Sequence, residues 1–519
     1  MIDIIRILSI SLFGLMIPVE GFSQPNPGDV FREYYWHDVS GDAGQSLRVG
    51  GQYDYGGQDI KLNHDFDLED AVRAEVIIEK ILCHDSTRGL SIQVNGRDWI
   101  AIPEADSIAY PQYAYQHHFY PVVEIPLEML NFGEDNVFKM KVSPIHAWSW
   151  PQNLINGVHF SIYYDALKKP HPTGEILSPL LGDSLGNTVI FTAEGHNPEG
   201  GISKIDYIGL YDDVNLEGDG IYYQWHYHYY HGELTGHIGS SLSEPYAVEW
   251  DTSWIPDQAQ PMQVAARISD ETGLMYMTQA VTGLDLVRND FSVELSRPYR
   301  IPQAWVTRKS VKREYFDING DIGNVVAAEL VWSSWSPGYM NGIYINNVKV
   351  FDREGPLYQS YTHRVSIDSL GVFQQGENIL STGLTPLVNG EMVHGMEVNW
   401  PGIMVLIKYE DQTSSSIDVN SGKDAYPSPF EAFSIYPNPF NESTTLQYTL
   451  LESARVSCTI ASITGQVVRT IDDSFHEPGT WTYTWDGRND QGTAVGSGVF
   501  ISVLHAGGYR MTRKMIHLR

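Results

Sequence analysis

The sequence predicts an all-β protein made of several β-sandwich domains. Short runs of alternating apolar and polar residues, bounded by Gly, Pro, Asn and Asp, recur along the chain. One set of these runs occurs twice in the same order, and a separate set closes the chain. Because 519 residues exceed what one hydrophobic core usually supports, we expect about three or four domains.

The internal repeat defines two of these domains. The matching segments are 74–96 with 327–347, 123–137 with 365–379, and 157–165 with 402–410. Asn95-Gly96 predicts a tight hairpin, and the steps Gly133-Glu134-Asp135-Asn136 and Gly376-Glu377-Asn378 each predict a turn before the next strand. These stretches loosely resemble galactose-binding-like jelly-roll domains. We therefore expect jelly-roll-like sandwiches at residues 24–170 (copy 1) and 289–411 (copy 2).

Between the two copies, residues 171–288 have the strand rhythm of a different sandwich and resemble a bacterial immunoglobulin-like module. This middle module carries an acidic and His-rich insertion. Its first part places oxygen-bearing side chains at every second position, at Asp213, Asn215, Glu217 and Asp219. Calcium takes six to eight oxygen ligands on a flexible loop, so these four residues are the predicted calcium ligands. A solvated acidic turn is the alternative.

The second part of the insertion, residues 222–231, reads as a strand with two different faces. One face carries His226 and His228, with His231 following, and is a candidate ligand-binding or transition-metal site. A hydrogen-bonded Tyr/His surface is the alternative and the favoured one, so calcium is preferred over a transition metal. On the other face, from Tyr223 to Tyr229, the alternate side chains are aromatic and predict a buried core rather than a sugar platform.

Trp148 and Trp150 are further candidates for ligand binding. They share a face at period two and lie near a predicted strand end, where an aromatic ring can stack on a sugar. The sequence contains no nucleophile elbow, His-Glu-x-x-His helix or phosphate-binding glycine loop. No catalytic residue is therefore assigned, and whether the protein is an enzyme stays open.

Charge and cysteine content narrow the class of partner. The net charge is −31, whereas residues 434–519 hold seven Lys/Arg and seven Asp/Glu, so all of the excess lies upstream. Nucleic acid is therefore not expected as a partner. The two cysteines, Cys83 and Cys458, fall in different predicted domains, which excludes a disulfide framework and predicts buried thiols.

The N-terminus reads as a secretory signal peptide over residues 1–23. Arg6 precedes an apolar run that ends at Val19, and the small residues Gly21 and Ser23 stand at the cleavage positions. The run is short for a membrane span. We expect a mature chain that starts near Gln24 and has no transmembrane helix.

At the other end, a Ser-rich linker at 412–433 precedes a small sandwich at 434–519. Four landmarks occur in order in this domain. They are Tyr436-Pro437-Asn438-Pro439-Phe440, Trp485-Asp486-Gly487, Gly496-Ser497-Gly498-Val499-Phe500, and the terminal Lys514-Met515. With them, the domain resembles the C-terminal sorting domain of the type IX (Por) secretion system. The resemblance implies export by that machinery to the medium or the outer-membrane surface.

Three functions remain open at the sequence level. The preferred one is a secreted or surface-displayed carbohydrate-associated binding protein. The second is a secreted glycan-cleaving hydrolase or lyase with its site near the His-rich insertion. The third is a structural surface protein or adhesin, for which calcium would stabilise the fold while no polysaccharide binds.

Overall fold

The computed structural model describes most of the chain. The described residues are 25–37, 47–51, 56–83, 89–103, 117–143, 153–216, 221–230, 232–302, 305–410, 430–436, 438, 440–441, 443–450, 454–462, 467–477, 479–506 and 509–518. The predicted signal peptide and nearly all of the predicted linker fall outside them. The chain forms two compact units, Gln24–Ala425 and Tyr426–Arg519, with Met1–Ser23 grouped with the second. No helix in the described part is long and apolar enough to cross a membrane.

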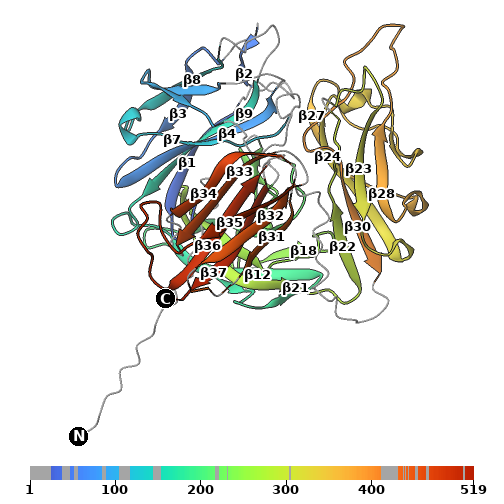
Figure 1. Ribbon diagram of the computed structural model, residues 1–519. Coiled ribbons are helices and arrows are strands. Elements are labelled where there is room, and N and C mark those ends of the chain that lie inside the picture. Colours follow the sequence, from blue (N-terminus) through green and yellow to red (C-terminus); the bar gives the residue numbers. More distant parts are fainter. Residues whose placement is uncertain are drawn as a thin grey trace. The chain divides into compact units, whose positions relative to one another are not determined.

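The protein is nearly all β, as predicted (Figure 1). Copy 1 packs two sheets face to face. One sheet has the order β1 (Val30–His37), β9 (Asn153–Tyr164), β4 (Ala71–Cys83) and β7 (Val122–Glu124), with β2 (Leu47–Val49) also on β9. The other has the order β3 (Ile60–Asp65), β8 (Asp135–Lys141), β5 (Ser91–Val94) and β6 (Trp99–Ala101). The 3₁₀ turn η3 (Leu127–Met129) leads into β8.

Copy 2 repeats this strand order. Its first sheet is β22 (Phe291–Ser296), β30 (Met404–Glu410), β24 (Val325–Trp335) and β27 (Ser360–Ser366), with β29 (Glu397–Val398) on β24. Its second is β23 (Lys312–Ile318), β28 (Gly376–Thr382), β25 (Ile343–Ile345) and β26 (Val348–Phe351). The 3₁₀ turns are η5 (Ile322–Asn324), η6 (Pro337–Tyr339) and η7 (Leu370–Val372). The internal repeat read from the sequence is therefore a repeat of topology.

A buried asparagine pair occupies the same place in both copies. Asn95 Nδ2 donates to Asn136 Oδ1 over 2.7 Å, and Asn346 Nδ2 donates to Asn378 Oδ1 over the same distance. Asn136 and Asn378 are fully buried, and each also bonds backbone groups of its own turn. The predicted Gly-Glu-Asn turn thus holds the hairpin loop of the neighbouring strand pair in place.

The middle module has two main sheets. The smaller is β10 (Thr173–Ser178), β12 (Thr188–His196) and β18 (Val248–Asp251). The larger contains β11 (Ser184–Leu185), β13 (Ile202–Asp212), β14 (Tyr223–His226), β17 (Gly239–Ser241), β19 (Met262–Asp270), β20 (Leu274–Met277) and β21 (Val281–Leu286). A hairpin of β15 (His228–Tyr230) and β16 (Glu233–Thr235) completes the insertion.

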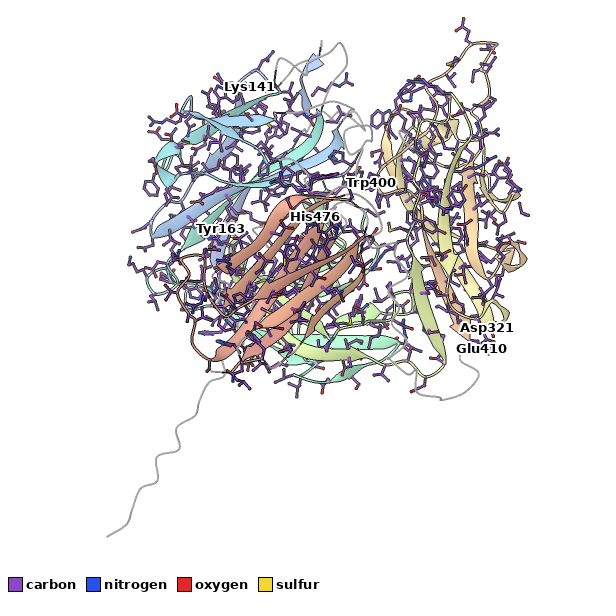
Figure 2. All side chains as sticks on the ribbon, in the orientation of Figure 1. Lys141, Tyr163, Asp321, Trp400, Glu410 and His476 are labelled. Atoms are coloured by element: carbon purple, nitrogen blue, oxygen red, sulfur yellow. The ribbon has the colours of Figure 1, made fainter. Side chains whose placement is uncertain are left out.

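Strand β1 belongs to copy 1 and to the middle module at once. Phe31 pairs with Tyr163 on β9 on one side and with Met275 on β20 on the other, so the two sheets are continuous. Every residue of β9 is buried, because the sandwich core covers one face and the middle module covers the other. Tyr163, labelled in Figure 2, lies on that outer face. Copy 1 and the middle module are therefore joined by backbone hydrogen bonds and not only by a linker.

The C-terminal unit is a separate two-sheet sandwich. Its sheets are β31 (Phe430–Tyr436), β32 (Thr444–Leu450) and β35 (Gly479–Trp485), and β34 (Val467–His476), β33 (Ala454–Ser462), β36 (Gly498–Ala506) and β37 (Tyr509–His517) (Figure 1). Cys458 is a free, buried thiol in its core, as predicted, and burial raises its pKa to about 12. The side chain of Cys83 is outside the described set.

Candidate functional site

The acidic loop follows β13, and the structure describes its first half. Asp213 Oδ1 accepts a hydrogen bond from Val214 N over 2.7 Å, and Asn215 Nδ2 donates to the Ile221 carbonyl over 2.7 Å, which ties the two ends of the loop together. Burial raises the pKa of Asp213 to about 7. Glu217 and Asp219 lie outside the described residues, so the predicted calcium set is seen only in part.

His226 is buried beside β13. Its Nε2 lies 2.8 Å from the Tyr211 carbonyl and therefore donates to it, and its ring centroid is 4.4 Å from that of Tyr211. Burial lowers the pKa of His226 to about 4. A neutral, hydrogen-bonded ring of this kind is a structural element of the module.

His228 lies on the next short strand and faces copy 1. Its ring stacks on Tyr120 with centroids 5.0 Å apart, and burial, with smaller contributions from His226 and His118, lowers its pKa to about 3. Among the described residues, no three His, Cys, Asp or Glu side chains form a group that could hold a metal ion. His231, Trp148 and Trp150 are outside the described residues, and their predicted roles stay predictions.

The aromatic face of the insertion is core at Tyr227 and Tyr229, as the sequence predicted, whereas Tyr223 and Trp225 are only half-buried, and this core lies between modules. Tyr227 and Tyr229 are buried against Phe31, Ile77 and Tyr163 of copy 1. The insertion therefore serves as the contact layer that closes the outer face of the β1–β9–β4 sheet.

Sequence reasoning missed a column of rings at this junction. Tyr229 lies 4.0 Å from His159, His159 lies 4.2 Å from Tyr35, and Tyr35 lies 4.9 Å from His37, all between ring centroids. The alternation from Glu33 to His37 on one strand was the available signal. The partner strand could not be read from it, because pairing between distant strands has no local pattern.

An ion pair stands at the buried end of the column. Arg267 donates to Glu33 over 2.9 Å and to the Tyr229 hydroxyl over 2.9 Å, and Tyr229 in turn donates to Glu33. Burial is the main reason that the pKa of His159 is well below its usual value, and Arg267 adds to the effect. The junction between copy 1 and the middle module is therefore polar, and the His159 ring within it is uncharged.

The C-terminal landmarks come together at one end of their sandwich. Asn438 Oδ1 accepts from Ile516 N over 2.8 Å, which ties the first landmark to the last strand. The ring of Trp485 lies 5.4 Å from Phe440 and 5.1 Å from Phe500, and its Nε1 donates to the Arg488 carbonyl. Three landmarks therefore share one aromatic core.

The remaining residues of the predicted sorting signal fall around this core. Tyr436 ends β31, Gly498 begins β36 with Gly496 just before it, and Lys514 lies on β37 opposite Ile501. Pro437 and Pro439 are outside the described residues. Gly487 has a φ of +67°, and a Cβ there would lie 3.0 Å from the His517 ring, so the turn after Trp485 favours glycine.

Comparison with known proteins adds one sequence match. Residues 440–504 match the family described as FlgD Ig-like domain, which covers less than half of the chain and lies in the C-terminal unit. No curated protein matches the chain.

Several solved structures share distant likeness with this chain. Dimeric latent PorU from Porphyromonas gingivalis is 12% identical, with 69% of this chain and 35% of that chain covered at a TM-score of 0.16. BpGH86A, a β-porphyranase from Bacteroides plebeius, is 10% identical, with 47% and 37% covered at 0.19. The fibronectin(III)-like modules of CbhA from Clostridium thermocellum are 8% identical, with 66% and 93% covered at 0.15. The chain spans about a third of PorU, and at these TM-scores the likenesses carry no functional weight.

Proposed function

We propose that this protein is exported by the type IX secretion system and binds polysaccharide at the cell surface or in the medium. The observation that supports export is the C-terminal unit, in which the four landmarks lie together at one end of the sandwich. Asn438, Phe440, Trp485 and Phe500 are mutually packed or bonded to the final strand there. Such a self-contained unit suits a domain that the secretion machinery recognises independently of the rest of the chain.

The part of the chain that would be exported, residues 24–411, supports a binding role more than a catalytic one. Two sandwiches of equal topology flank a module whose larger sheet is continuous with the first sandwich through β1. The net charge of −31 disfavours polyanionic ligands. A neutral polysaccharide is the partner class that fits both features.

A glycan-cleaving enzyme is the second candidate, and one observation favours it. The buried carboxylate of Glu79 raises the pKa of Tyr35 beyond the effect of burial, and the Tyr35 ring lies 4.2 Å from the His159 ring, tilted by 41°. A carboxylate, a phenol and an imidazole exchange protons when they come within hydrogen-bonding distance, and among the described residues the Tyr35 hydroxyl and His159 Nε2 have no hydrogen-bond partner. This group lies beside the His-rich insertion, where the sequence placed a candidate site.

Calcium binding by the acidic loop is part of the proposal. The raised pKa of Asp213 means that a cation would stabilise its ionised form. At ten times the dissociation constant, calcium would add about 1.4 kcal/mol to the stability of the loaded form. Replacing both Asp213 and Asp219 by Ala should abolish a calcium-dependent rise in melting temperature, and an unchanged rise would show that calcium binds elsewhere.

The export proposal is tested in a bacterium that has a type IX system. The full chain should reach the medium or the cell surface, and a chain without residues 430–519 should stay in the cell envelope. Asn438→Ala removes the acceptor for Ile516 N and should reduce export partially. Equal export of the truncated chain, or export from a strain without the machinery, would contradict the proposal.

A further inference from the structure

Copy 2 has an exposed aromatic side chain, that of Tyr358, at a position with an unusual backbone conformation. Tyr358 lies in the loop between β26 and β27, is 55% exposed, and has a φ of +56°. Positive φ is rare for a bulky residue, because Cβ collides with the backbone. Such strain costs about 1–3 kcal/mol and collects at functional sites. Burial does not offset it here, since more than half of the side chain is in solvent.

Two loops are locked together to hold this conformation. Ser336 is fully buried, also has a positive φ of +55°, and its Oγ accepts a hydrogen bond from Tyr358 N over 2.8 Å. Ser336 N donates to the Gln359 carbonyl over 2.9 Å, and Gly338 N donates to the Pro356 carbonyl over 2.9 Å. The Tyr358 loop and η6 therefore form one rigid piece.

The locked loops bring a second tyrosine against the first. The Tyr339 hydroxyl donates to the Tyr358 hydroxyl over 3.0 Å, and the two rings meet edge to face at 5.7 Å. Thr385 Oγ1 donates a hydrogen bond to the Tyr339 carbonyl over 3.0 Å. The His394 ring packs against Tyr358 with centroids 5.8 Å apart, and its Nδ1 donates to the Gly395 carbonyl over 3.0 Å while its Nε2 lies 3.5 Å from Glu397 Oε1. We call Tyr339, Tyr358 and His394 the tyrosine platform.

The chemistry of the platform matches a sugar ring. An exposed aromatic face takes apolar C–H groups, while phenol hydroxyls at its edge bond to hydroxyl groups. A pyranose has both kinds of surface, one apolar face and a rim of hydroxyls. Because the platform is ordered by its own loops, little side-chain entropy is lost on binding.

We propose that the tyrosine platform binds a neutral polysaccharide, with one sugar ring stacked on Tyr358, a sugar hydroxyl bonded by Tyr339, and His394 positioning the Tyr358 ring. This site is distinct from the His-rich insertion and from Trp148 and Trp150. It rests on the proposed polysaccharide-binding function and assigns that function to the loop end of copy 2.

The test is retention of the full chain in gels that contain dextran, xylan, galactomannan, starch or agarose. Tyr358→Gly is the decisive variant, because glycine accepts the positive φ and removes only the ring. Retention should fall at least tenfold while the melting temperature stays the same or rises. Tyr339→Phe keeps the ring and removes the hydroxyl, so its loss should be smaller.

Trp99→Ala is the matched control, because Trp99 is a partly exposed aromatic residue on copy 1, and its retention should equal that of the wild type. If the wild type is retained and Tyr358→Gly is retained equally, the platform is wrong and the proposed function stands. If no polysaccharide retains the wild type, both fail. A lower melting temperature for Tyr358→Gly would show that the tyrosine is structural and overturn the assignment.

Discussion

The two jelly-roll copies share one topology but use the outer face of their first sheet in opposite ways. In copy 1, His159 pairs with Ile77 and Ser161 with Glu75; in copy 2, the corresponding pairs are Met404 with Val331 and Leu406 with Glu329. Within the described residues, His159 Nε2 and Ser161 Oγ have no hydrogen-bond partner. Copy 2 packs the same face through an apolar cluster.

The comparison shows which features the fold requires. Leu406, Val293 and Val331 pack with Val214 and Trp254 of the middle module, and Arg297 of copy 2 forms an ion pair with Asp212 of that module. At its junction with the middle module, copy 1 instead buries the ion pair of Arg267 with Glu33 and the column of tyrosine and histidine rings. His159 and Ser161 of copy 1 have apolar counterparts in copy 2, so the architecture does not demand polar residues at these two positions, and the buried ion pair and rings make the first junction sensitive to charge and pH.

The largest expected effect comes from breaking the ion pair of copy 1. Arg267→Ala leaves Glu33 buried without its cation, and we expect a loss of about 3–5 kcal/mol in the free energy of unfolding. Urea denaturation measures it. The double variant Glu33→Leu with Arg267→Met imitates the apolar copy 2 junction and should recover much of the loss. If the double variant is less stable than Arg267→Ala, the two junctions are not interchangeable.

The matched change in copy 2 is Leu406→Ala. Leu406 is fully buried, and removing its side chain leaves a cavity, so we expect a loss of about 3 kcal/mol. Unlike the loss in the Arg267 variant, this loss should change little with pH between 5 and 8, because the substitution removes only apolar groups and no charged side chain. A strong pH dependence of the loss would contradict the apolar account of this junction.

The asparagine pairs should behave alike in both copies. Asn136→Ala and Asn378→Ala each remove a buried side chain that bonds a partner asparagine and its own turn, which should cost about 2 kcal/mol. Chemical denaturation of both variants should give losses that agree within about 0.5 kcal/mol. A loss of stability in only one copy would mean that the two copies share their topology but not the stabilising role of the asparagine pair.

The smallest effect is the pH response of His159. Its pKa is lower in the folded than in the unfolded protein, so its contribution to stability is complete above about 6.5 and is lost as pH falls from there toward the folded value. His159→Met, which takes the copy 2 residue, should flatten the dependence of the melting temperature on pH between 6.5 and about 4.5. An unchanged slope would assign the acid sensitivity to other histidines such as His226.

The sequence predicted those features that depend on neighbours in the chain. Asn95-Gly96 has the positive φ pair of a tight hairpin, and the alternation from Tyr223 to Tyr229 indicated a buried face, because both patterns are local. The ring column required knowing that β1 pairs with β9 and that the insertion covers both. The strained Tyr358 gave no local signal, since its conformation depends on Ser336 in another loop.

The central claim is that the protein binds a neutral polysaccharide without cutting it. The direct measurement incubates the full chain with the polysaccharide panel and records bound protein and newly formed chain ends in the same samples. We predict saturable retention by at least one polysaccharide and no increase in reducing or unsaturated ends. Release of new ends would contradict the claim in favour of a glycan-cleaving enzyme, and absence of both would favour a structural surface protein.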